Sequence, residues 1–221
     1  YDAPYTRYEA EAGTGNGTIQ SSYDQSNIAS EASGRTCVRL NGGNSREWTA
    51  SAKFRGIVVR ASSGTEGGTG KAKLYVGGNY VTTLLLEDSY GWKHMNDNPQ
   101  NYNGINNGGS RMRFQEARYL LSSSQNAGTK IKIEADGNLY LDFVEAEDVA
   151  DAIPCPSGYK QYTGNGSNLQ QWLDSNGGNV YIPAGNYNVS GCINVGSRIV
   201  QGAGMWYTNL KWNGGSTGNI G

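Results

Sequence analysis

Short runs in which apolar and polar residues alternate, separated by Gly and Asn, fill most of the first 150 residues. Successive side chains of a strand point to opposite faces, so this alternation predicts strands with one buried and one exposed face. The predicted strands are Thr6–Glu11, Cys37–Leu40, Arg46–Ala52, Gly56–Ala61, Lys71–Val76, Asn79–Leu86, Arg111–Leu121, Lys130–Glu134 and Tyr140–Glu147. Their spacing is typical of a β-sandwich.

Two local patterns add detail to these strands. The pair Gly77–Gly78 between two of them indicates a tight hairpin, because glycine accepts a positive φ at both turn positions. The last strand alternates with a period of two, which predicts Leu139, Leu141 and Phe143 on one face. Trp48 alternates within its own strand and is predicted to lie in the core.

The pattern changes near residue 150. Residues 151–158 contain two prolines and are typical of a linker. Residues 168–174 predict one short helix with Asn168 as its N-cap. Very short strands follow, at a spacing typical of the coils of a parallel β-solenoid. These predicted strands are Asn179–Ile182, Tyr187–Val189, Ile193–Val195, Arg198–Gln201 and Asn209–Trp212.

Composition and charge exclude several classes of protein. The 221 residues include 33 Gly and 15 Tyr but only 3 Phe, with 18 basic and 19 acidic side chains. This balance gives no reason to expect nucleic acid as a partner, because phosphate binding needs a clustered basic surface. No apolar run approaches the ~18–20 residues that a membrane span needs. Heptad repeats, and with them a coiled coil, are absent.

Several motifs resemble carbohydrate-active proteins. Tyr8-Glu-Ala-Glu11 and the stretch 137–145 resemble the opening and closing strands of carbohydrate-binding module families 6 and 35, which are jelly-roll sandwiches. Residues 177–190 resemble the first strands of a pectate-lyase-like right-handed β-helix. Together with four further motifs, the chain resembles glycoside hydrolase family 87, the α-1,3-glucanases and mycodextranases. Those motifs are residues 5–11, 31–34, 47–49 and 202–209.

The resemblance implies an all-β chain with two parts. A jelly-roll sandwich is expected over residues 1–150, followed over 151–221 by the first coils of a right-handed parallel β-helix with a short capping helix. It also implies secretion and a polysaccharide, specifically a glucan, as partner. In that family the catalytic aspartates lie on later coils of a longer β-helix, so no residue here inherits a catalytic role. The leading hypothesis is the non-catalytic N-terminal part of an α-glucan hydrolase, which binds or orients glucan.

Three carboxylates are candidate metal ligands. Glu9 and Glu11 point to the same side if both lie on a strand. In the resembled modules, acidic residues at these positions and at that of Asp142 hold a structural calcium ion, which implies Ca²⁺ here. Carboxylate oxygens suit Ca²⁺, and three adjacent carboxylates repel one another without a cation. The alternative is that the glutamates are solvated or paired with Arg7 or Arg39.

A second set of carboxylates is considered as a glycosidase acid and nucleophile. Its members are Asp136, Asp142, Glu145 and Glu147. Alternation points Asp142 away from Glu145 and Glu147, so they do not share one site without a bulge. Surface charge with one metal ligand is the favoured interpretation.

Aromatic and amide side chains suit sugars, because rings stack on pyranose faces and amides bond hydroxyls. Tyr90, Trp92 and Tyr102 lie in a long Asn- and Gly-rich loop and are candidate sugar contacts. Asn138 occupies the position where the resembled modules present a ligand-binding asparagine. The alternative is that Trp92 packs over the edge of the sandwich.

The interpretation of the three cysteines depends on the implied secretion. Cys155 and Cys192 are candidates for a disulfide that ties the linker to the first coils. Cys37, in an apolar strand, is then a buried free thiol. His94 is the only histidine, so it makes no zinc cluster and is interpreted as a loop residue. N-glycosylation sequons occur at Asn16, Asn165 and Asn188.

A solenoid of only a few coils is expected to have an open end. Unpaired strand edges at such an end can pair with further strands. The remainder of a β-helix chain is one partner for this end, and identical subunits that stack head to tail are another. Two further functions therefore stay open. One is a stand-alone carbohydrate-binding module. The other is a structural subunit of an extracellular filament that keeps the hydrolase scaffold.

Overall fold

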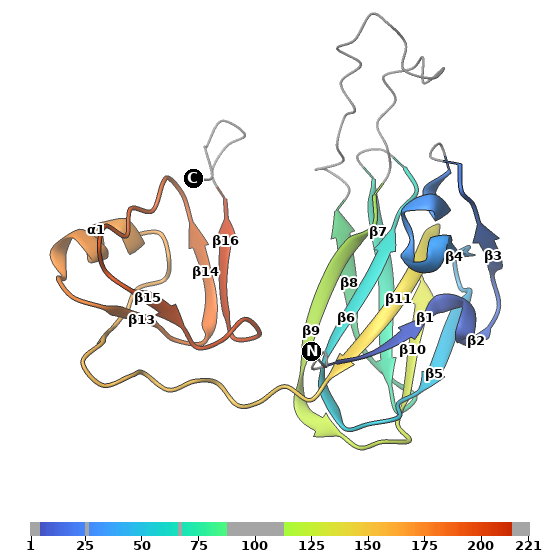
Figure 1. Ribbon diagram of the computed structural model, residues 1–221, viewed down its shortest axis with the longest axis horizontal. Coiled ribbons are helices and arrows are strands. Elements are labelled where there is room, and N and C mark those ends of the chain that lie inside the picture. Colours follow the sequence, from blue (N-terminus) through green and yellow to red (C-terminus); the bar gives the residue numbers. More distant parts are fainter. Residues whose placement is uncertain (1–4, 25–26, 66–67, 88–112, 214–221) are drawn as a thin grey trace, which may run out of the picture. The chain divides into compact units, whose positions relative to one another are not determined.

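Strands make up most of the regular secondary structure of the computed structural model (Figure 1), which confirms the all-β expectation. The residues that it describes are 5–24, 27–65, 68–87 and 113–213. The chain divides into two compact units, Tyr1–Asp148 and Val149–Gly221. None of the helices among these residues is long and apolar enough to cross a membrane.

The first unit contains two antiparallel sheets. In the six-stranded sheet the order is β3-β4-β11-β6-β9, and β1 pairs with the same edge of β11 as β4 does, further along the strand. Its strands are β1 (Tyr5–Glu9), β3 (Thr18–Ser21), β4 (Thr36–Leu40), β6 (Phe54–Ser62), β9 (Gln115–Gln125) and β11 (Leu139–Glu147).

The five-stranded sheet has the order β2-β5-β10-β7-β8. Its strands are β2 (Thr14–Gly15), β5 (Ser45–Thr49), β7 (Thr69–Val76), β8 (Asn79–Glu87) and β10 (Lys130–Ala135). The described part of this unit also contains three 3₁₀ turns, η1 (Ala10–Ala12), η2 (Ile28–Glu31) and η3 (Ser33–Arg35). The predicted hairpin joins β7 to β8, with φ of 58° at Gly77 and 83° at Gly78.

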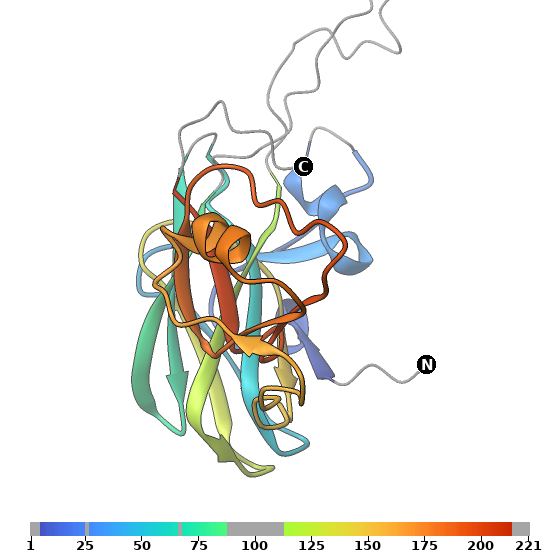
Figure 2. The same cartoon turned by 90° about the vertical axis from the view of Figure 1, so that its left-hand side faces the viewer.

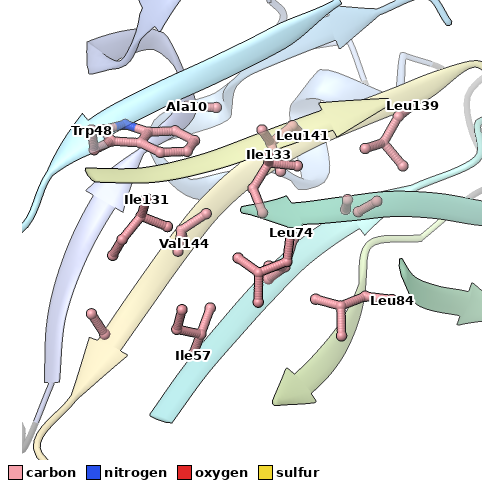
Figure 3. Close-up of a cluster of buried hydrophobic side chains, with 14 of the residues drawn as sticks. Ala10, Trp48, Ile57, Leu74, Leu84, Ile131, Ile133, Leu139, Leu141 and Val144 are labelled. Carbon is pink, nitrogen blue, oxygen red and sulfur yellow. The ribbon is translucent and has the colours of Figure 1, made fainter. Parts of the chain in front are cut away.

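One apolar core lies between the two sheets (Figure 3). Ile131 and Ile133 of β10 face Leu141 and Val144 of β11, and each of these side chains is fully buried. Trp48 is buried in the same cluster, as predicted, and its Nε1 donates to the carbonyl oxygen of Glu9 at 3.0 Å. This alternation of buried side chains on both inner faces holds the sheets together.

Strand β11 departs from strict alternation. Its register with β6 shifts between Leu141 and Phe143, so Val144 takes the inward position that the sequence pattern gives to Phe143. Phe143 lies on the outer face instead, with the guanidinium groups of Arg7 and Arg60 at 3.9 and 5.6 Å from its ring centroid. The predicted placement of Phe143 beside Leu139 was wrong because a bulge reverses the facing of every later residue.

The second unit stacks short parallel strands. β12 pairs with β13, β13 pairs with β15, and β14 pairs with β16. We call β13 and β14 the first coil and β15 and β16 the second coil, and the two lie side by side. The elements are β12 (Lys160–Gln161), α1 (Leu169–Ser175), β13 (Val180–Ile182), β14 (Gly185–Val189), β15 (Val200–Gly202) and β16 (Thr208–Trp212).

Helix α1 lies beside the short strands of this unit (Figure 2). Its Leu169 and Leu173 are buried in one apolar cluster with residues of β13 and β14. The helix agrees with the prediction to within one residue, but Asn168 makes no side-chain cap. Its Oδ1 accepts from the hydroxyl of Tyr162 at 2.7 Å instead, and this buried tyrosine also accepts from the amide of Gly166 at 2.8 Å.

The expected strand Ile193–Val195 is absent, and residues 190–199 form a loop beside α1. The amide of Asn194 donates to Gln170 Oε1 of α1 at 2.6 Å, so a side chain takes a backbone group that a strand would use. Arg198 Nη1 donates to the carbonyl oxygens of Leu173 and Asn176 at the end of the helix. The loop therefore serves as the cap of α1.

Candidate functional site

An acidic cluster lies where β1 ends and β11 bulges. Asp142 is fully buried, and its Oδ2 forms an ion pair with Nη1 of Arg60 from β6. Its Oδ1 accepts from the backbone amide of Ser33 at 2.9 Å. Burial raises the pKa of Asp142 to about 6, although Arg60 and the Ser33 amide lower it, and the charge of Glu9 raises it further.

Glu9 and Glu11 belong to different elements, and the charge of Glu9 acts on Asp142. Strand β1 ends at Glu9, and Glu11 lies in the turn η1, so they do not share one face of a strand as expected. Glu9 Oε1 accepts from the hydroxyl of Ser33 at 2.9 Å. The Oε2 atoms of Glu9 and Glu11 are both buried without a hydrogen-bond partner. Such orphaned carboxylate oxygens are costly unless a cation or another donor meets them.

The cluster fits a cation only in part. Across the described residues, no group of three or more His, Cys, Asp or Glu side chains is arranged to hold a metal ion. Both oxygens of Asp142 have partners, Arg60 and the Ser33 amide. The orphaned oxygens of Glu9 and Glu11 are each hard donors, which is the chemistry that Ca²⁺ prefers.

Arg60 is the partner that the sequence analysis missed. It is an arginine in the otherwise apolar run Gly56–Ala61, and a lone charge in such a strand signals a buried counter-charge. The register pairs Arg60 with Phe143, the residue after Asp142. Neither the signal nor the pairing identifies the acidic partner before the sheet is assembled.

Two of the other candidate carboxylates, Glu145 and Asp136, are each held by a cation. Glu145 pairs with Arg7 at 2.6 Å, and Asp136 with Lys73 at 3.5 Å. An acid and a nucleophile of a glycosidase must instead face a common substrate. These contacts agree with the interpretation of charges that serve the fold.

The predicted sugar contacts Tyr90, Trp92 and Tyr102, like His94, lie outside the described residues. Asn138 is described and is exposed in the turn between β10 and β11. All three sequon asparagines are exposed as well. Asn165 Oδ1 accepts from the hydroxyl of Ser167 at 2.8 Å.

The disulfide between Cys155 and Cys192 is not formed in the structure, where all three cysteines are free thiols. Cys155 Sγ lies 3.7 and 3.8 Å from the carbonyl oxygens of Pro156 and Tyr159, whereas Cys192 is exposed in the loop 190–199. Cys37 is fully buried, as predicted. Burial raises the pKa of Cys37 to about 12, and the charges of Asp142 and Glu11 add to the rise.

Thiol titration tests this assignment. In the native chain we expect Cys155 and Cys192 to react with Ellman's reagent and Cys37 to react only after denaturation, because a buried, protonated thiol is a poor nucleophile. The count is taken before and after adding denaturant, on material purified without reductant. A native protein with no reactive thiol would contradict the structure and support the Cys155–Cys192 bridge.

Comparison with known proteins assigns the first unit. A family model described as the α-1,3-glucanase catalytic domain D1 matches residues 2–149, about two-thirds of the chain. The chain belongs to this family. The match ends at the boundary between the two units, so the sandwich corresponds to domain D1. No curated protein matches the chain.

Solved structures of family 87 α-1,3-glucanases resemble both units. A catalytic domain in complex with nigerose is 27% identical with a TM-score of 0.75. The catalytic unit of a thermostable enzyme from Streptomyces thermodiastaticus strain HF3-3 is 29% identical with a TM-score of 0.78. Both matches cover 96% of this chain but only 41% and 42% of those structures. The chain therefore spans about two-fifths of the catalytic domains that it matches.

Proposed function

We propose that the chain is the non-catalytic N-terminal part of a secreted family 87 α-1,3-glucanase, and that its sandwich binds or orients α-1,3-glucan. The observation that carries this proposal is the match of the D1 family model to the whole sandwich. A related catalytic domain is described in complex with nigerose, and another with tetrasaccharides, so a glucan ligand is the natural inference. Hydrolysis would use residues beyond this chain.

Binding and hydrolysis are tested separately on the 221-residue chain. We expect the chain to be depleted from solution by insoluble α-1,3-glucan and to release no reducing sugar from it. Insoluble β-1,4-glucan is the matched control polymer. Release of reducing sugar would show a catalytic apparatus in this chain and refute the non-catalytic assignment. Absence of depletion on the α-1,3-glucan would refute the binding role.

The second coil supports a continuing right-handed β-helix. Leu210 of β16 stacks in register on the buried Tyr187 of the first coil, yet 48% of its own surface is exposed. Ile199 and Val195, in the loop 190–199, are exposed as well. In a solenoid each coil buries its apolar residues against the next one. We propose that further β-helix coils of the same enzyme cover these residues, in preference to identical stacked subunits.

We also propose that Ca²⁺ binds at Glu9 and Glu11. The support is that Oε2 of Glu9 and Oε2 of Glu11 are both buried without a hydrogen-bond partner, and that the charge of Glu9 acts on the buried Asp142. When bound, the ion would neutralise carboxylates and tie the end of β1 to η1. Its role would be structural, because the proposed binding of glucan does not involve the ion.

Metal addition and removal test the ion. We expect millimolar Ca²⁺ to raise the thermal midpoint of the chelator-treated chain. At a Ca²⁺ concentration a hundredfold above the dissociation constant, the free energy of unfolding should rise by about 2–3 kcal/mol. Glu11→Gln should abolish the shift, whereas Glu116→Gln, at an exposed position of β9, should leave it unchanged. Equal midpoints with Ca²⁺ and with chelator would refute the site.

A further inference from the structure

We propose that the outer face of the five-stranded sheet binds a neutral glucan chain, with the exposed ring of Tyr80 as the surface on which a sugar stacks. We call this surface the tyrosine face: Tyr75, Tyr80, Lys73, Lys132 and Glu134. The proposal rests on the glucan-binding role proposed above, to which it adds a location. It uses none of residues 88–112, which lie outside the described residues.

Alternation along the strands forms this face. Ala72, Leu74 and Val76 of β7 are buried in the core, so Lys73 and Tyr75 between them point outward. The register then places outward residues of neighbouring strands in rows. Tyr80 of β8, Tyr75 of β7 and Lys132 of β10 form one row, and Lys73 and Glu134 belong to the next.

The two tyrosine rings hold each other in place. Their centroids are 5.6 Å apart with an interplanar angle of 70°, which is an edge-to-face contact. The hydroxyl of Tyr80 lies 3.0 Å from Thr83 Oγ1. Although held at its edge and at its hydroxyl, Tyr80 remains 56% exposed. A ring that is ordered before binding loses little freedom on binding, and its apolar face suits the C–H face of a pyranose.

Directional polar groups lie next to the rings. Lys132 Nζ is 3.8 Å from the centroid of Tyr75 and 3.3 Å from Glu134 Oε2. The hydroxyl of Tyr75 donates to Glu134 Oε1 at 3.4 Å. An ammonium group donates and a carboxylate accepts, so sugar hydroxyls, which do both, find partners beside the stacking ring.

The charges nearest the rings compensate one another. Lys73 lies 3.8 Å from Glu134 and 3.5 Å from Asp136, and Lys130 lies 3.4 Å from Glu47. Paired charges at a surface present little net field to a polyanion or a polycation. An exposed aromatic ring amid compensated polar groups matches an uncharged, hydroxyl-rich polymer, which is the chemistry of α-1,3-glucan.

Variants at Tyr80 test the face in the 221-residue chain. Depletion isotherms on insoluble α-1,3-glucan are expected to show binding about tenfold weaker for Tyr80→Ala and Tyr80→Leu. Tyr80→Phe keeps the ring and loses only the hydroxyl that contacts Thr83, so its affinity should stay within about twofold. Tyr23→Ala is the matched control, because Tyr23 is 83% exposed but lies outside this face.

The outcomes separate the two proposals. Tyr80→Leu retains an apolar side chain, and its urea unfolding curve shows whether the hairpin survives the change. If the wild-type chain binds and both Tyr80→Ala and Tyr80→Leu bind with the same affinity, the tyrosine face is refuted. The proposed glucan binding would then still stand. A loss that Tyr23→Ala shares equally would also overturn it. Absence of wild-type binding would overturn the proposed function and this site together.

Discussion

Replacing Arg60 with leucine should destabilise the sandwich by about 3–5 kcal/mol, because it leaves the fully buried carboxylate of Asp142 without its counter-charge. The remaining partner of that carboxylate is the Ser33 amide, which does not neutralise it. Urea unfolding in chelator gives the free energy, and hydrogen exchange of β11 amides assigns the loss to the sandwich.

Two variants sharpen the Arg60 experiment. Arg118→Leu, at an exposed position on the neighbouring strand β9, should change stability by no more than about 0.5 kcal/mol. Adding Asp142→Asn to Arg60→Leu removes the unpaired charge and should restore more than half of the loss. If Arg60→Leu costs no more than Arg118→Leu, the ion pair does not stabilise the fold.

Leu141→Ala should cost about 2–5 kcal/mol, the range for a truncated core leucine whose cavity does not collapse. Leu141 is fully buried on β11, within the core (Figure 3). It is paired with Val38 on one side and with Ala61 on the other. Neighbouring strands on both edges limit how far the backbone can move to fill the space.

Leu85→Ala is the matched control for Leu141→Ala. The same atoms are removed from the edge strand β8, where Leu85 is 55% exposed, so we expect a change within about 0.5 kcal/mol. Both variants are compared by urea unfolding at equal slope. Similar losses for the two would contradict the central position of β11 in the core.

Alternation alone predicted most of the strands of the sandwich. The hairpin at Gly77–Gly78 and the burial of Trp48 were predicted because turn chemistry and period are local properties. The facing of Phe143 was not, because a bulge depends on how β11 meets β6. The coil strands were harder, since a side chain of α1 decides that residues 190–199 remain a loop.

The candidate site was predictable in its residue types and not in its pairing. The charge of Glu9 raises the pKa of Asp142, and the charges of Asp142 and Glu11 raise the pKa of Cys37, while a metal ion at these carboxylates stays a prediction. The sequence pattern could not show that Arg60, 82 positions from Asp142, would take its carboxylate. Long-range choices between partners depend on the register of the assembled sheet.

The pairing of β1 with β11 has a consequence for the order of folding during synthesis. Tyr5 lies opposite Glu147, so the first strand of the sandwich has no partner until almost the whole unit has been made. At about 5–20 residues per second, β1 waits on the order of ten seconds. Contacts between such distant positions also close slowly. The sandwich is therefore a late-closing unit, and chaperone demand should be greatest just before residue 147 emerges.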